Sequence, residues 1–227
     1  MILANKKKSL VSGDGKEMLL AREEYLQSGI YDFLVEEILS VAGKSLRKNV
    51  LEIGCGTGFY LNRIADRLKP EGVYGSDVSK EAIKMCAKKY PQYSFLVDNA
   101  FDLNLKGETI DLLLSVFSPF EHKEVERVLS PGGDLIVVRP GQNHLRELYQ
   151  MIGLKTKEKG SLGFEKIEKI SEKTVVKKVQ ISAKQISLLI RMTPLFWNIN
   201  KEKFDIDRLN CPELTLEFQV WQGKKVG

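Results

Sequence analysis

Short apolar runs separated by amphipathic segments make up the middle of this chain. Residues 57–68 and 79–89 carry apolar side chains at helical spacing, and Ser79 and Glu81 suit the start of the second helix. The runs that have the character of strands are Val50–Ile53, Val73–Gly75, Ser94–Val97, Ile110–Leu114 and Leu135–Val138. Strands that alternate with crossover helices predict an α/β fold with a mostly parallel sheet flanked by helices.

Two helical segments precede the first of these strands. They cover residues 17–27 and 30–41, and the second places Tyr31 and Leu34 on one apolar face. We therefore predict that residues 1–45 form an N-terminal helical segment.

The pattern changes after Gly153. Residues 174–182 and 215–221 alternate between apolar and polar positions and predict strands, with a helix between them at 183–191. Residues around 154–172 are polar and predict a loop. The sequence thus predicts one α/β domain over 46–227, with seven strands in all and a polar loop or insert near its middle.

Composition places the chain among ordinary soluble globular proteins. It has 227 residues, of which 43% are hydrophobic and 29% charged, and no apolar stretch approaches the length of a membrane span. Cys55, Cys86 and Cys211 lie far apart without CxxC spacing, which argues against a zinc site built from this chain. We expect a cytoplasmic protein without a structural metal.

The positive charge is concentrated in the last third of the chain. The net charge is +1 over residues 1–48, −2 over 49–150 and +6 over 151–227. A localised basic surface suggests a polyanionic partner, above all RNA. A solvated lysine-rich surface explains the same excess equally well.

A glycine-rich turn follows the first strand. Gly54, Gly56 and Gly58 alternate with Cys55 and Thr57 in a G-x-G-x-G pattern, which differs from the G-x-G-x-x-G turn of dinucleotide-binding proteins. Glycines there permit positive φ and a close approach of the backbone to a ligand. We predict that Gly54, Gly56, Thr57 and Gly58 line a cofactor site.

Acidic residues next to this turn indicate which cofactor it holds. Glu52 would repel a pyrophosphate, but it can hold the ammonium group of S-adenosylmethionine through charge or water. Asp77 ends the second strand, where a carboxylate accepts both ribose hydroxyls, and Asp98, with Asn99 beside it, is placed to accept the adenine amino group. Alternatively, Asp77 only caps the helix that starts at Ser79 and Asp98 only closes a turn. The register of all three acids with the glycine turn favours S-adenosylmethionine.

Several stretches outside the glycine turn are characteristic of one family. They are Gly13–Asp14, Glu17–Met18, Ala21–Arg22, Gly29–Tyr31, Gly75–Lys84, Ala87–Pro91, Ser118–Pro119, Pro140–Leu145 and Met192–Trp197. Through them the chain, from about Lys8 onwards, resembles the class I methyltransferases that modify N1 of a guanine in 23S ribosomal RNA.

The resemblance implies a Rossmann-like class I methyltransferase whose cofactor is contacted by Tyr31, Gly56, Thr57, Asp77 and His144. It implies ribosomal RNA as substrate and partner, and a helical segment at 1–45 that packs over the cofactor site. Family members begin with a cysteine-rich zinc module, and this sequence starts directly at the segment after it. We therefore expect no zinc, and the departure leaves the substrate open.

The residues that act on the substrate are less clear from the sequence. Phe117, Phe120 and Trp197 are candidates for stacking on an extruded base, with core packing as the alternative. No residue is identified as a catalytic base. Three functions remain: an RNA guanine methyltransferase, a methyltransferase for a small metabolite, and a non-catalytic protein that binds S-adenosylmethionine. A homodimer is left open.

Overall fold

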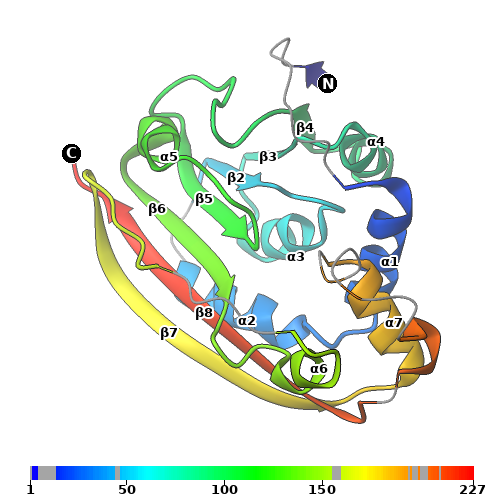
Figure 1. Ribbon diagram of the computed structural model, residues 1–227. Coiled ribbons are helices and arrows are strands. Elements are labelled where there is room, and N and C mark those ends of the chain that lie inside the picture. Colours follow the sequence, from blue (N-terminus) through cyan, green and yellow to red (C-terminus); the bar gives the residue numbers. More distant parts are fainter. Residues whose placement is uncertain are drawn as a thin grey trace.

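The chain folds around one twisted sheet (Figure 1). The computed structural model describes residues 2–4, 14–43, 47–154, 160–193, 195, 199, 204–209 and 211–227. The strands lie in the order β1-β4-β3-β2-β5-β6-β8-β7. Their bounds are β1 (Ile2–Ala4), β2 (Asn49–Ile53), β3 (Gly72–Asp77), β4 (Ser94–Val97), β5 (Ile110–Val116), β6 (Leu129–Pro140), β7 (Ile167–Gln180) and β8 (Glu213–Lys225).

Most neighbouring strands are parallel. Strands β1 to β6 pair in parallel with their neighbours, while β8 is antiparallel to both β6 and β7. Strands β2 to β8 form the predicted seven-stranded sheet of a class I methyltransferase fold, so that prediction is confirmed. The short β1 adds one more strand beside β4.

Helices cover both faces of this sheet. Their bounds are α1 (Lys16–Gln27), α2 (Asp32–Ala42), α3 (Phe59–Leu68), α4 (Lys80–Lys89), α5 (His122–Val128), α6 (Arg146–Met151) and α7 (Ala183–Arg191). Because side chains alternate along a strand, Leu112 and Leu114 of β5 join the larger hydrophobic cluster with α1 to α4 and α7. Leu113 faces the other way, into a smaller cluster that includes Val125 and Val128 of α5.

The polar segment at 154–172 is not a loop throughout. Its last six residues, 167–172, are the start of β7, which pairs with β8 along its whole length. The strand lies at the edge of the sheet, so Glu168 and Lys169 can point into solvent while Ile167 packs in the smaller cluster. Polarity alone therefore misled the prediction, because an edge strand needs few apolar side chains. Residues 155–159 lie outside the described part of the chain.

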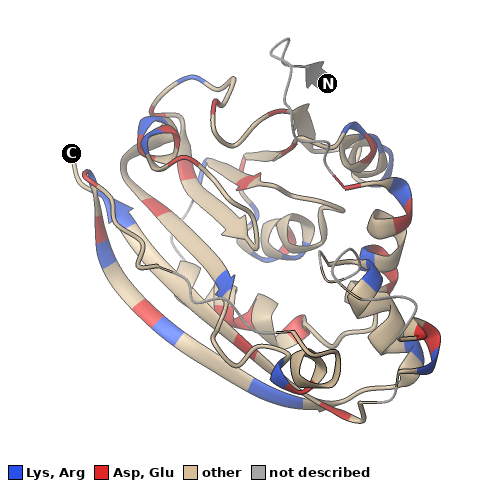
Figure 2. Ribbon diagram, viewed as in Figure 1, with Lys and Arg blue, Asp and Glu red and all other residues tan. Residues whose placement is uncertain are grey.

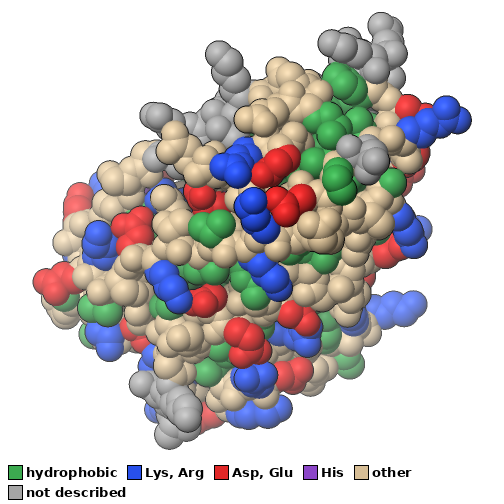
Figure 3. Space-filling view, turned by 90° about the horizontal axis from the view of Figure 1, so that it is seen from below, with side chains coloured by type: hydrophobic (Ala, Val, Ile, Leu, Met, Phe, Trp, Pro, Cys, Tyr) green, Lys and Arg blue, Asp and Glu red, His purple; other side chains and the backbone are tan. Residues whose placement is uncertain are grey.

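Charges of both signs intermix on the surface (Figures 2 and 3). Several lysines of the last third have carboxylate partners: Lys173 Nζ lies 2.7 Å from Glu37 Oε2, and Lys178 Nζ lies 3.0 Å from Glu213 Oε1. Lys177 Nζ lies 4.9 Å from the centroid of the Phe33 ring. Glu213 is already counted in the net charge of +6 for this third, whereas Glu37 belongs to α2, so an acid of another segment offsets part of that charge.

Within the described residues, no helix has the length and apolarity needed to cross a membrane. The same residues contain no group of three or more His, Cys, Asp and Glu side chains arranged to hold a metal ion. Cys55, Cys86 and Cys211 are buried free thiols.

Candidate cofactor and substrate site

The glycine turn joins β2 to α3 at the carboxyl edge of the parallel strands, where ligands bind in open α/β sheets. Gly54, Gly56 and Gly58 have φ values of 64°, 52° and 73°. Residues with a side chain rarely adopt this left-handed region of backbone conformation, so the turn requires glycine at these three positions.

The segment after β5 and helix α1 pack against the glycine turn. A methyl group on Gly54 would overlap the Ser118 side chain, which follows β5. A methyl group on Gly56 would lie 3.1 Å from Nη1 of Arg22, on α1. Ser79 Oγ also donates to the Asp14 carbonyl at 2.8 Å. The segment before α1 and α1 itself therefore contact the elements that surround the turn.

Asp77 ends β3 and accepts two backbone hydrogen bonds. Its Oδ2 accepts from Gly56 N–H at 2.9 Å, and its Oδ1 accepts from Ser79 N–H at 2.8 Å. The carboxylate therefore holds the glycine turn and the start of α4 in one arrangement. Burial raises the pKa of Asp77, and the two hydrogen bonds oppose that rise. Each oxygen retains a lone pair that a ribose hydroxyl can use.

Glu52 has a partner that the sequence did not suggest. Its side chain is 1% exposed, and its Oε2 accepts a hydrogen bond from Leu61 N–H, in the first turn of α3, at 2.9 Å. Burial raises the pKa of Glu52 well above its usual range, although the bond from Leu61 opposes this. The carboxyl group therefore fastens α3 behind the glycine turn, and its contact with the ammonium group of the cofactor stays a prediction.

Asp98 is likewise engaged with its own chain. Its oxygens accept from Asn99 N–H, Asn104 N–H and Asn104 Nδ2, at 2.8 to 3.0 Å. The Asn99 side chain in turn accepts from Phe101 N–H at 3.1 Å. These bonds match the alternative in which Asp98 closes a turn, and contact of Asp98 and Asn99 with adenine stays a prediction. The turn follows β4, next to β3, so the pair still lies at the same edge of the sheet as Asp77.

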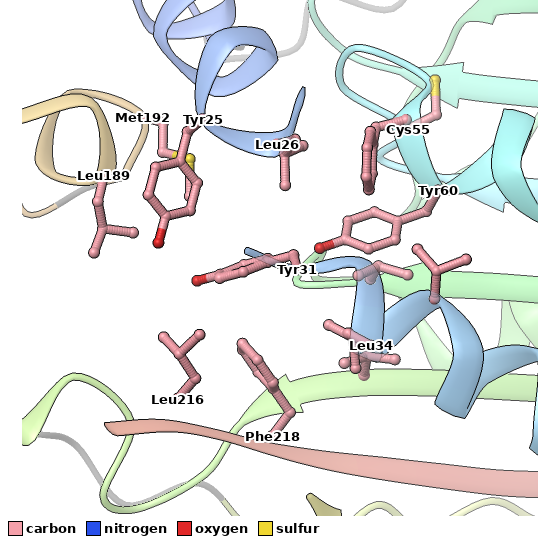
Figure 4. Close-up of a cluster of buried hydrophobic side chains, with 14 of the residues drawn as sticks. Tyr25, Leu26, Tyr31, Leu34, Cys55, Tyr60, Leu189, Met192, Leu216 and Phe218 are labelled. Atoms are coloured by element: carbon pink, nitrogen blue, oxygen red, sulfur yellow. The ribbon is translucent and has the colours of Figure 1, made fainter. Parts of the chain in front are cut away.

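Aromatic side chains gather beside the turn (Figure 4). Tyr31 is buried at the start of α2, with its ring 5.2 Å from that of Phe218 and 6.4 Å from that of Phe117. The hydroxyl groups of Tyr25 and Tyr60 point towards Tyr31. This cluster brings together residues from the helical segment, from α3, from the residue after β5, and from β8.

His144 reaches the same cluster from the loop after β6. Its ring lies 4.6 Å from Phe218, and its Nδ1 accepts a hydrogen bond from Glu217 N–H at 3.3 Å. The structure thus brings His144 and Tyr31 together on one ring, that of Phe218. Phe218 could not be recognised as a site residue from the sequence. The alternation of apolar and polar residues along its strand predicts only that the side chain is buried.

The three stacking candidates have different surroundings. Phe117 is 40% exposed and has a φ of +61° at the end of β5. Phe120 belongs to another group, with its ring 6.3 Å from Phe164 and 5.5 Å from His122, against the smaller cluster on the opposite face of the sheet. Trp197 lies outside the described residues. Only Phe117 among the described candidates is placed beside the glycine turn.

Two buried hydroxyls next to the turn have no hydrogen-bond partner among the described residues: Thr57 Oγ1 and Tyr60 Oη. Buried polar groups are normally paired, so these atoms indicate a ligand that supplies the missing bonds. Together with the glycine cradle and the Asp77 carboxylate, they fit a polar cofactor such as S-adenosylmethionine.

Comparisons with known proteins identify the class of this domain. Residues 50–133 match the family model described as a methyltransferase domain. The chain is 35% identical over 149 residues to the 23S rRNA (guanine(748)-N(1))-methyltransferase of Streptomyces fradiae, and this match covers 63% of the chain but only 53% of that relative. It is 29% identical over 209 residues to a Micromonospora griseorubida protein named "Putative 23S rRNA (guanine-N(1)-)-methyltransferase", covering 82% of the chain and 71% of the relative.

Solved structures show the same fold at low identity. A SAM-dependent methyltransferase from Aquifex aeolicus superposes with a TM-score of 0.54 at 16% identity, over 92% of this chain and 99% of that one. The YcgJ protein of Bacillus subtilis gives a TM-score of 0.55 at 16% identity, over 85% and 98%. The chain therefore contains a class I methyltransferase domain, the class whose cofactor is S-adenosylmethionine.

Proposed function

We propose that this protein methylates N1 of a guanine in 23S ribosomal RNA. The names of the Streptomyces fradiae and Micromonospora griseorubida relatives support this substrate. The structural observation that carries the proposal is Phe117, an exposed aromatic side chain held beside the cofactor turn.

Phe117 has the properties expected of a platform for a base. A non-glycine residue at positive φ costs of order 1–3 kcal/mol and is concentrated at functional sites. Here the strain is held in place, because Phe117 N–H donates to the Val138 carbonyl at 3.0 Å and the ring packs 5.3 Å from Phe218. The residue is still 40% exposed, and stacking on an aromatic ring stabilises a base by about 1–3 kcal/mol.

Methyl transfer depends mainly on the orientation of the cofactor relative to the methyl acceptor. The transferred methyl group comes from the sulfonium of S-adenosylmethionine, and its in-line displacement is accelerated when the two reactants are held in the correct geometry. We assign the positioning of the cofactor to the glycine turn, Asp77 and Thr57. Tyr31 and His144, which we still expect to contact the cofactor, form with Phe117 the substrate wall, between the cofactor turn and the base.

Transfer of tritium-labelled methyl groups tests the substrate class. The purified protein is incubated with labelled S-adenosylmethionine and either deproteinised 23S ribosomal RNA or a small-molecule extract of the same cells. We expect label in the RNA, and much less of it when Asp77→Ala replaces the wild type at the same limiting concentration of cofactor. Label in the extract alone would establish a metabolite methyltransferase, and cofactor binding without transfer to either would establish a non-catalytic protein.

A further inference from the structure

One cation lies directly on the cofactor turn and has no role in the chemistry described above. Arg22 projects from α1, and its Nη1 atom is 3.1 Å from the position that a Gly56 Cβ would occupy. The side chain is 25% exposed, so it is neither free in solvent nor sealed in the core. Its charge also acts on Asp77: burial raises the pKa of that carboxyl group, and Arg22 counteracts the rise.

The guanidinium is fixed on two sides. It forms an ion pair with Asp14, and its Nη2 donates to the Met192 carbonyl at the end of α7 at 3.0 Å. Since a guanidinium carries five N–H donors in a planar fork, these two contacts leave further donors for a ligand. An arginine held in this way loses little side-chain entropy when it binds an anion.

We infer that Arg22 binds the carboxylate of the methionine part of S-adenosylmethionine. The inference rests on the cofactor of the domain and not on the identity of the methyl acceptor. A carboxylate brought to the glycine turn meets acidic neighbours, Asp14 and Asp77, which would repel it. Arg22 supplies the opposite charge at that position, and its fork matches a carboxylate through two parallel hydrogen bonds.

Two cofactor analogues separate this role from a structural one. S-adenosylmethionine and decarboxylated S-adenosylmethionine share the adenosine, the sulfonium and the amino group, and differ in the carboxylate alone. Calorimetric titration with both ligands, in the absence of RNA, measures what the carboxylate contributes. The matched control is Arg63→Gln on α3, where the arginine pairs with Asp32 at the surface and lies over the Phe59 ring.

We expect Arg22→Gln to weaken binding of S-adenosylmethionine by about tenfold or more, the loss typical of a charge-assisted hydrogen bond. Binding of the decarboxylated analogue should stay the same or strengthen, because the variant removes a positive charge that repels this more cationic ligand. Arg63→Gln should bind both ligands as the wild type does. An equal loss for both ligands in Arg22→Gln would show that Arg22 only supports the fold, and an unchanged affinity for S-adenosylmethionine would equally overturn the inference.

Discussion

The two ends of the sheet are held together by different kinds of contact. At the cofactor end, β2, α3, β3 and α4 follow one another along the chain, and contacts within this segment hold the glycine turn, such as Glu52 with Leu61 and Asp77 with Gly56. At the other end, β6, β8 and α6 bring His144 and Phe218 together through antiparallel pairing of distant segments. Most of the cofactor site thus comes from one continuous segment, to which α1 adds Arg22, whereas the proposed substrate wall combines segments that lie far apart in the sequence.

The largest effect should come from the residue that links the two ends. Phe218 is fully buried, and its ring contacts those of Tyr31, Phe117 and His144. We expect Phe218→Ala to destabilise the protein by about 3–5 kcal/mol through the cavity it leaves. Urea unfolding measures this, with Ile170→Ala as control because Ile170 is 56% exposed on β7. A similar loss of unfolding free energy in both variants would show that Phe218 does not connect the two ends of the sheet.

The next effect isolates the cofactor end. Asp77→Ala removes the acceptor of the Gly56 and Ser79 N–H bonds together with the proposed ribose contact. We expect S-adenosylmethionine affinity to fall by about 1.5–3 kcal/mol for each charge-assisted bond that the variant removes. Calorimetric titration is the measurement, and Asp66→Ala on the exposed side of α3 is the control. A folded Asp77→Ala protein with unchanged affinity would remove the ribose assignment.

The substrate wall is tested by a pair of aromatic residues three positions apart. Phe117→Ala should lower methyl transfer to RNA by about 1–3 kcal/mol in transition-state stabilisation, the value of one stacked base. Its S-adenosylmethionine affinity should stay near that of the wild type. Phe120→Ala should leave both nearly unchanged, because Phe120 stacks with Phe164 on the opposite face. Equal losses of transfer from the two variants would contradict this division.

The smallest effect concerns the basic C-terminal third. Lys178 is already paired with Glu213 and Lys177 lies over Phe33, so neither charge is wholly available to RNA. Reversal of both lysines to glutamate should weaken RNA binding and reduce the slope of its salt dependence by about one to two, since each neutralised phosphate adds roughly 0.7–0.9 to that slope. Filter binding at several salt concentrations tests this, with Lys80 and Lys84 of α4 reversed as the control. A larger loss of RNA affinity in the control variant would show that the RNA binds near α4, at the cofactor end of the sheet.

The difference between the cofactor end and the substrate wall also explains which features could be predicted from the sequence. The G-x-G-x-G turn requires positive φ at Gly54, Gly56 and Gly58, so local physics alone locates it. Asp77 follows from its position at the end of a strand. Glu52 is predicted to hold the ammonium group of the cofactor, and the structure adds a bond from Leu61 N–H, which depends on how α3 packs against β2. Nothing in the local sequence reveals this second role of the carboxylate.

The substrate wall was harder to predict because its members come from separate segments. Phe117 and Phe120 look alike in the sequence, and only the path of the chain after β5 sends them to different groups. Arg22 stood out only as part of a family stretch, since its contact with Gly56 joins α1 to the turn after β2. The start of β7 at Ile167 was missed because its pairing with β8 compensates for a polar sequence.

The central claim is that the site at the carboxyl edge transfers a methyl group to N1 of guanine. The most direct test is nucleoside analysis by mass spectrometry of 23S ribosomal RNA after reaction with the protein and S-adenosylmethionine. We expect 1-methylguanosine to be formed by the wild type, and in far smaller amount by Asp77→Ala at the same limiting concentration of cofactor. A methylated nucleoside of any other kind, or the absence of a new one while a metabolite is methylated instead, would contradict the claim.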